Sequence, residues 1–133
     1  MKTTIKISLL SLVAALYSCK NDDSVDKELK EAAVSMNNMA PQTLSDGIRL
    51  DSVSAGHLSL KYNYTLTEDV KENVSEADIK SFKEMAKDEA RKSLQSSSDM
   101  EELKNHEVKF NYVYYDKNGK VTTDFSVSPD EYK

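Results

Sequence analysis

The sequence predicts an α+β fold, a two-layer sandwich in which about four antiparallel strands form one sheet and the helices cover one of its faces. Residues 58–66 alternate between apolar and polar side chains, as a half-exposed strand does. Residues 108–115 and 121–127 alternate in the same way on either side of Asn118-Gly119, a pair typical of a hairpin turn. Two further segments repeat their apolar residues at helical spacing.

The first helix and the first hairpin are predicted in the N-terminal half. Val25, Leu29, Ala33 and Met36 share one helical face, which predicts a helix over 25–37. Pro41 disfavours helix at the residue before it, so the helix should end before that point. A short strand near 47–54 follows, with a turn at Gly56, and the alternating strand over 58–66 completes the hairpin.

The second helix and the second hairpin complete the order αββαββ. Ser75 and Asp78 have the spacing of a capping box, and the apolar stripe behind them predicts a helix over 76–95 with a solvated charged face. Ser98 and Glu101 repeat that spacing, which indicates a further helical turn over 99–104. The turn at Asn118-Gly119 should be of type I′.

Composition limits the classes of function. The chain has 133 residues, one Cys, no Trp and a formal net charge of −5. This length accommodates one domain. A single Cys excludes an internal disulfide framework and a zinc site built from several cysteines. The acidic balance argues against nucleic acid as a partner, because a phosphate backbone is bound by basic surfaces.

The N-terminus has the pattern of a secretory signal peptide. Lys2 and Lys6 are followed by uncharged residues over 7–17 and then by Ser18-Cys19. The uncharged run fits the apolar region of a signal peptide and is shorter than the roughly 20 residues of a membrane-spanning helix. We therefore predict a signal helix within residues 1–18.

Leu16-Tyr17-Ser18-Cys19 resembles the lipobox of bacterial lipoproteins, in the relaxed form of Bacteroidota, although Tyr17 replaces the usual small residue. The resemblance implies that the Cys19 thiol carries a diacylglycerol, that the chain is cut just before it and that the new amine is acylated. Several acyl chains anchor a protein stably, since each buried methylene contributes about 0.8 kcal/mol. The implied location is the cell envelope, on the outer membrane, at its periplasmic or surface face.

The residues after the lipobox are polar. Lys20-Asn21-Asp22-Asp23 resembles the surface-export signal of Bacteroidota lipoproteins, and a solvated tether explains the same residues equally well. The predicted organisation is a signal peptide over 1–18, a lipidated Cys with a polar tether over 19–25, and one α+β domain over 26–133. Ser24 and Ser52 lie in Asp-Ser-Val triplets, which resemble the O-glycosylation motif of exported Bacteroidota proteins.

The chain contains no recognisable catalytic or metal-binding motif. Its histidines, His57 and His106, are predicted beside a turn and before a strand, where solvated side chains are expected. Neither G-x-S-x-G nor H-E-x-x-H is present. Asp116-Lys117-Asn118-Gly119 lacks the acid spacing of a calcium loop. We expect no cofactor, no metal and no catalytic residue.

Tyrosine and phenylalanine gather on three of the predicted strands. Most of these side chains should face the helices as core, whereas Val113 and Tyr115 are predicted on the opposite face. An exposed Tyr can bind a partner at low entropy cost. Packing, or a single exposed Tyr, explains the same pattern.

The body of the chain, with IRLDSV, LSLKYNYTL and VYYDKNGKV, resembles small bacterial envelope proteins without assigned activity. The leading hypothesis is a non-enzymatic, lipid-anchored envelope protein whose domain binds a protein or another ligand, and an immunity or inhibitor protein fits this class. The alternatives are a small hydrolase that uses His57 or His106, and an accessory subunit of an outer-membrane complex.

Overall fold

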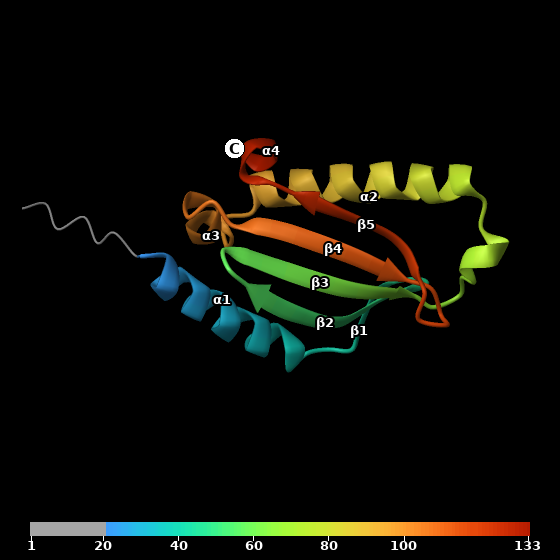
Figure 1. The fold of residues 1–133 in the computed structure, drawn as a ribbon, viewed down its shortest axis with the longest axis horizontal. Coiled ribbons are helices and arrows are strands. Elements are labelled where there is room, and N and C mark those ends of the chain that lie inside the picture. The colour runs from blue at the N-terminus through green and yellow to red at the C-terminus, as the bar shows by residue number, and fades with distance from the viewer. Residues whose placement is uncertain (1–20) are drawn as a thin grey trace, which may run out of the picture.

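The computed structural model describes residues 21–133. The predicted signal peptide, Cys19 and Lys20 therefore lie outside the described residues. In chain order the elements are α1 (Asp22–Asn37), β1 (Gln42–Ser45), β2 (Ile48–Gly56), β3 (Ser59–Leu66), the 3-10 turn η1 (Lys71–Asn73), α2 (Glu76–Ser96), α3 (Glu101–Asn105), β4 (Lys109–Tyr115), β5 (Val121–Val127) and α4 (Pro129–Tyr132). Figure 1 shows α1 running along the β2 side of the sheet and α2 along its β5 edge.

The strands form a single mixed sheet in the order β1-β2-β3-β4-β5. The α+β class is confirmed, but the prediction of four antiparallel strands is wrong in number and direction, because β3 and β4 are parallel. The reason is α2. At 1.5 Å per residue its 21 residues span about 31 Å, enough to return the chain along the sheet so that β4 starts beside the start of β3.

The additional strand is β1, a segment for which no element was predicted. All four of its residues are exposed, so it has no apolar alternation. It pairs antiparallel with β2 through a turn at Asp46-Gly47, where Gly47 has a φ of 79°. An Asp-Gly pair is a hairpin signal, and it was the sequence feature that could have revealed β1.

One face of the sheet carries the core. Leu60, Phe110 and Val127 lie on neighbouring strands in register and are fully buried. Val25 and Leu29 of α1 belong to the same cluster, together with Leu94 of α2 and Tyr132 of α4. The helices therefore share this face. The opposite face carries mostly polar, partly exposed side chains, including Asn63, Asn111 and Ser126.

Helix α1 begins earlier than predicted. Asn21 is its N-cap, and its side chain accepts a hydrogen bond of 3.0 Å from the backbone N–H of Ser24. Such a cap satisfies one of the free N–H groups of the first turn. Residues 22–25, which were predicted as part of the polar tether, thus form the first turn of the helix. Val25, Leu29 and Ala33 are its buried residues.

The β4–β5 hairpin is confirmed, but its turn is not of type I′. That turn requires positive φ at both central residues, whereas here only Gly119 of the pair has it, at 84°. Asp116 explains the difference. Its buried carboxylate accepts the N–H groups of Asn118 (2.8 Å), Lys120 (2.9 Å) and Lys71 (2.9 Å), which shapes the turn around the acid.

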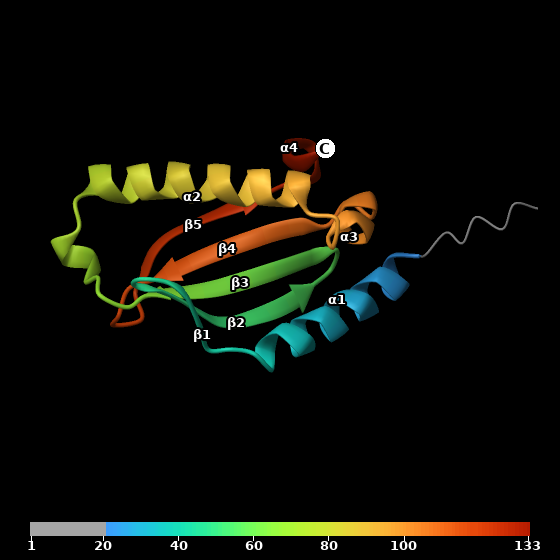
Figure 2. The ribbon, with the colours of Figure 1, turned by 180° about the vertical axis from the view of Figure 1, so that it is seen from behind.

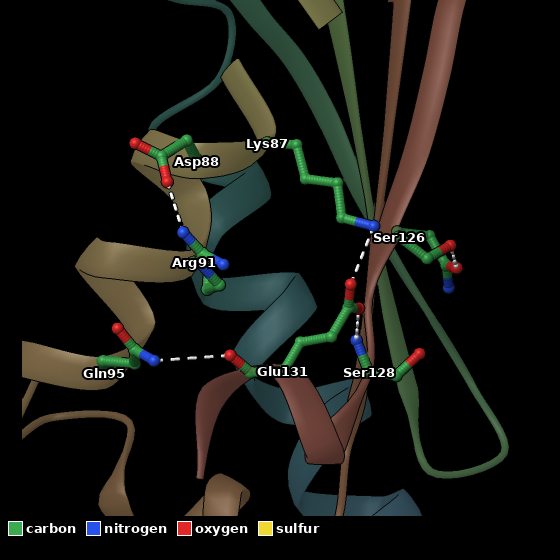
Figure 3. Close-up of polar contacts among 8 residues, drawn as sticks. Lys87, Asp88, Arg91, Gln95, Ser126, Ser128 and Glu131 are labelled. Carbon is green, nitrogen blue, oxygen red and sulfur yellow. Dashed lines mark hydrogen bonds and ion pairs between the residues drawn. The ribbon is translucent and has the colours of Figure 1, made fainter. Parts of the chain in front are cut away.

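The C-terminal helix α4 was not predicted, because Pro129 comes directly after the last alternating run and is compatible with the end of a strand. Pro is favoured at the first helical position. Ser128 and Glu131 form a capping box in which Glu131 Oε2 accepts the Ser128 N–H at 2.7 Å. Figure 3 shows the other contacts of Glu131: its carboxylate pairs with Lys87 of α2 at 2.8 Å, and its carbonyl lies 3.4 Å from the amide nitrogen of Gln95.

Candidate functional site

A groove of about 510 Å³ lies between α2 and β1, over the central strands of the sheet. We call it the tyrosine groove. It is lined by Leu44, Ser45, Ile48, Tyr62, Tyr64, Phe82, Met85, Ala86, Glu89, Ala90, Ser93, Leu94, Ser97, Met100, Tyr112 and Tyr114. Figure 2 shows β1 lying across the end of the sheet on the side where α2 runs.

The floor of the groove consists of four tyrosines from the two central strands. The parallel register places Tyr62 beside Tyr112 and Tyr64 beside Tyr114. Within these pairs the rings are stacked, with centroids 5.3 Å and 4.8 Å apart. Phe82 of α2 meets the Tyr114 ring edge-on at 5.0 Å. The rings therefore stand side by side across β3 and β4.

The hydroxyl groups of these four tyrosines have no hydrogen-bond partner among residues 21–133. None of their oxygens is fully buried. In the described chain, the fully buried side-chain oxygen without a partner is Thr122 Oγ1. The residues are largely buried, with 8 % of Tyr62 and 9 % of Tyr112 and of Tyr114 exposed, but their hydroxyl oxygens at the bottom of the groove keep some accessible surface. Each can donate one hydrogen bond and accept others.

Burial of the rings keeps the hydroxyls protonated. It raises the pKa of Tyr62 to about 12 and moves the pKa of Tyr64 and of Tyr112 further upward. Burial raises the pKa of Tyr114 to about 12 as well, with a smaller contribution from the negative charge of Glu89. Neutral phenols with a high pKa are suited to hydrogen bonding and poor general bases near neutral pH.

The groove is open because α2 covers only part of the sheet. Of the 21 residues of α2, only Leu94 is classed as buried. The helix packs against β5 at the edge of the sheet and against α4. Ala86 and Ala90 face the groove with small side chains that stay partly exposed. This spacing leaves a groove above the tyrosines of β3 and β4, although the rings of Tyr62, Tyr112 and Tyr114 are themselves largely buried.

The rim of the groove combines apolar and acidic side chains. Leu44 of β1 is 52 % exposed and Met85 of α2 is 64 % exposed, and both line the groove. Glu89 is the only charged lining residue, and it has no ion pair within the described residues. In contrast, the neighbouring Asp88 pairs with Arg91 and Lys92. The rim therefore presents an apolar surface with one uncompensated negative charge.

The two histidines lie outside the groove. His57 Nδ1 is 2.7 Å from Asp26 Oδ2, and Asp26 Oδ1 accepts the N–H of Leu58 at 2.7 Å. The hydrogen bond to Asp26 raises the pKa of His57. No hydrogen bond joins His57 or His106 to a Ser or Thr in the described chain. Residues 21–133 also contain no cluster of three His, Cys, Asp or Glu suited to a metal ion.

Val113 and Tyr115 lie on the face opposite the groove. Their register neighbours Asn63 and Thr65 share that face, and the Tyr115 hydroxyl donates to Asn63 Oδ1 at 3.5 Å. Both residues are partly exposed. Their role in binding stays a prediction.

The other predicted site residues are distributed along the chain. Asn21, Asp22 and Asp23 form the start of α1, and Ser24 follows in its first turn. Ser52 lies in β2, where its Oγ accepts a hydrogen bond from Asn63 Nδ2 at 3.1 Å. Export and glycosylation through these residues remain predictions. No helix among residues 21–133 is long and apolar enough to span a membrane.

Comparison of the sequence with known families gives a match over residues 23–123, to a family described as a domain of unknown function, DUF8479. The chain belongs to this family. The match spans α1 to the middle of β5 and so includes every residue that lines the tyrosine groove. No curated protein matches the sequence of this DUF8479 chain.

The DUF8479 fold is shared with solved structures of low sequence identity. A protein of Pseudomonas aeruginosa described as secreted has a TM-score of 0.70 at 12 % identity, covering 84 % of this chain and 96 % of its own. The type II secretion system pilotin AspS of Vibrio cholerae has a TM-score of 0.62 at 10 % identity, covering 83 % and 94 %. The type 2 secretion system pilotin EpsS of Vibrio vulnificus has a TM-score of 0.64 at 7 % identity, covering 84 % and 94 %.

Most of the groove tyrosines of this DUF8479 domain were predicted as core, and no site was predicted there. Alternation assigned them to the correct face, but it does not show how far a helix covers that face. One feature did point to the groove. Ala86 and Ala90 of α2 line the groove beyond Phe82, and they are too small to cover four tyrosine rings.

Proposed function

We propose that this protein is a non-enzymatic binding domain of the cell envelope, which receives a segment of another envelope protein in the tyrosine groove. The observation that carries this proposal is the floor of four phenol hydroxyls, none of which has a partner in the described chain. An accessible row of neutral donors and acceptors between apolar walls is the arrangement of a binding pocket, in which a few polar groups orient the ligand.

The volume of the groove supports a ligand of considerable size. About 510 Å³ falls in the range of roughly 300–1,000 Å³ that is typical of binding pockets. Leu44 and Met85 extend the apolar lining to the rim, where a partner would cover them. Tyr is enriched where proteins bind one another, because its ring buries a large area and its hydroxyl still finds a polar partner.

The structural neighbours support a location in or beyond the envelope. One is described as secreted, and two are named as pilotins of secretion systems. Their identity to this chain is 12 % or less, so the likeness shows the fold. Of the hypotheses from the sequence, the two secretion-system neighbours favour a protein that works by binding. An accessory subunit of an outer-membrane complex would be such a protein.

Anchoring through lipid on Cys19 is part of this proposal. Only Lys20 and Asn21 lie between that Cys and the first residue of α1. A lipidated Cys19 would therefore hold the domain close to the membrane, with the N-terminal end of α1 nearest to it. An immunity or inhibitor protein is a specific form of the same proposal, in which the bound segment belongs to a toxin or an enzyme.

The hydrolase alternative receives less support. It requires a nucleophile within hydrogen-bond reach of His57 or His106. The polar side-chain partner of His57 is Asp26, and neither histidine lines the groove. Replacing each His by Ala without loss of the cellular phenotype would remove this alternative.

Site-specific photocrosslinking in the native cells tests the binding proposal. A photoreactive amino acid replaces Met85 at the rim of the groove in the full chain, and the matched control places it at Tyr115 on the opposite face. We expect the probe at position 85 to form a crosslink with one envelope protein that the probe at position 115 does not form. A crosslink from position 115 alone would assign binding to the opposite face and overturn the proposal.

A further inference from the structure

One wall of the tyrosine groove is an unpaired sheet edge. Strand β1 is the first strand of the sheet and pairs only with β2. Within residues 21–133, no other backbone or side-chain hydrogen bond reaches Gln42–Ser45. Leu44 and Ser45 of this strand line the groove. The free N–H and C=O groups of β1 are therefore next to the binding space.

This edge is short and has a register shift between Thr43 and Ser45, but it lacks the side chains that usually protect an edge strand. Besides short length and bulges, natural proteins protect such strands with Lys, Pro, inward charges or a covering helix. The four residues of β1 are Gln, Thr, Leu and Ser, all exposed, without charge and without Pro. Met85 is exposed on the helix that forms the other wall, so α2 does not cover the edge. The edge is available for pairing.

We propose that the partner segment binds in an extended conformation, as an additional strand on β1, and that alternate side chains of this segment enter the tyrosine groove. The inference rests on the proposed function and specifies the conformation and the chemistry of the bound segment. Strand addition to a free edge supplies main-chain hydrogen bonds for affinity, while pockets for alternate side chains supply specificity. A strand that pairs with the four residues of β1 is about 13 Å long.

The tyrosine hydroxyls favour an extended segment over a helix. A helix uses its main-chain N–H and C=O groups internally. Only its side chains could then form hydrogen bonds with the edge of β1 and with the tyrosine hydroxyls. An extended segment still has half of its main-chain groups available after it pairs with β1. These groups and polar side chains can satisfy the hydroxyls of Tyr62, Tyr64, Tyr112 and Tyr114. Leaving a buried hydroxyl without a partner costs about 1–3 kcal/mol.

The charge of the groove indicates the side chains of the segment. Leu44, Ile48 and Met85 form apolar walls, which match aliphatic or aromatic side chains. Glu89 is the single charge of the lining and has no ion pair in the described chain, so a Lys or Arg of the segment would complement it. The expected ligand is therefore a short extended peptide of another protein, with alternating apolar residues and one basic residue.

Backbone methylation of a selected peptide tests this inference. Twelve-residue peptides are selected from a random library on the mature chain and counter-selected on the Met85→Glu variant, so that the retained peptides depend on the groove. Each backbone N–H of the best peptide is then methylated in turn. A strand on β1 predicts that methylation at alternate positions weakens binding about tenfold or more, with little effect at the positions between.

Each outcome has a defined meaning. Losses at three or more consecutive methylated positions would indicate a helix in the groove, which overturns the extended conformation and retains the proposed function. Failure to obtain any peptide that depends on Met85 would overturn both. A dimer that forms at higher concentration and disappears in the Leu44→Glu variant would identify a second copy of this chain as the occupant of the edge and would also overturn the peptide inference.

Proline substitution of β1 gives an independent readout. Thr43→Pro and Leu44→Pro each remove one main-chain N–H of β1, beside and within the register shift between Thr43 and Ser45. A variant that keeps the wild-type melting temperature has lost an N–H that does not pair with β2. In such a variant the inference predicts that the peptide binds about tenfold more weakly. Unchanged peptide binding in both folded variants would contradict pairing on β1.

Discussion

The side chain of Asn37 completes the hydrogen bonding of Val53 at the free edge of β2. Asn37 Nδ2 donates to the Val53 carbonyl at 2.7 Å, and Asn37 Oδ1 accepts the Val53 N–H at 2.7 Å. Strand β1 pairs with β2 only from Ile48 to Leu50, so Val53 has no neighbouring strand on that side. The last residue of α1 thus acts as a single-residue substitute for a strand.

This contact predicts that Asn37→Ala destabilises the protein. The substitution leaves two main-chain groups of Val53 without their partner, which should lower the free energy of unfolding by about 1–3 kcal/mol. Urea unfolding measures the change. The matched control is Asn38→Ala, since Asn38 is also exposed and its side chain makes no hydrogen bond in the described structure. Equal effects of the two substitutions would show that the contact does not contribute.

The pair of His57 and Asp26 predicts a dependence of stability on pH. Asp26 raises the pKa of His57, and the nearby Asp22 and Asp23 act in the same direction. The stability that protonated His57 contributes is therefore complete below its unfolded pKa, about 6.5. It is lost as the pH rises through the higher folded value. The pKa of Asp26 is lowered, first by the Leu58 N–H and then by His57, so its contribution is lost only in acid.

We therefore expect the thermal unfolding midpoint to fall as the pH is raised from about 6 to about 9, across the titration of His57. The variant His57→Gln keeps a neutral hydrogen-bond donor and removes the titrating group, so its midpoint should change less over the same range. Differential scanning calorimetry measures both proteins. An equal fall in the variant would assign the pH dependence to other groups.

Lipidation predicts a requirement for Cys19. The variant Cys19→Ala should lose acyl labelling and should move from the membrane fraction to the soluble fraction, because the acyl chains are the proposed anchor. Surface exposure is a separate question, which protease treatment of intact cells addresses. Membrane fractionation of the variant at the level of the wild type would contradict the anchor.

The sequence was sufficient for elements whose pattern is local. Alternation located β3, β4 and β5 to within one residue, and capping at Ser75 located the start of α2. Local patterns of apolar residues failed for β1, whose four residues have no buried side and whose one signal was the turn at Asp46-Gly47. They failed again for α4, because Pro129 is compatible both with the end of a strand and with the start of a helix.

The direction of β4 and the tyrosine groove both depend on a long-range relationship. Alternation assigns a side chain to a face, but it contains no information about which strand is the neighbour. The length of α2 determines that β4 lies parallel to β3, and this register brings Tyr62 and Tyr64 beside Tyr112 and Tyr114. The position of α2 over β5 then leaves a groove above these rings. The sequence contains no local signal for the parallel direction, and its one pointer to the groove is the small size of Ala86 and Ala90 in α2.

Removing single tyrosine hydroxyls separates a binding role from a structural one. The Tyr112 hydroxyl has no partner within the described residues, whereas the Tyr132 hydroxyl donates to the buried carbonyl of Val108 at 2.7 Å. Tyr132→Phe should therefore lower the free energy of unfolding by about 1–3 kcal/mol, because the carbonyl loses its partner. Tyr112→Phe should leave it within about 0.5 kcal/mol of the wild type, because no hydrogen bond within the described residues is lost.

Binding should show the opposite order. Tyr112→Phe removes a group that the bound segment would use, so the affinity for a peptide that depends on the groove should fall by about five- to tenfold, as expected for the loss of one hydrogen bond. Tyr132 does not line the groove, and folded Tyr132→Phe should bind that peptide like the wild type. Isothermal titration calorimetry at a temperature where all three proteins are folded measures the affinities. If Tyr112→Phe lost stability and kept its affinity, the hydroxyl would belong to the fold and the groove would lose its main support as a binding site.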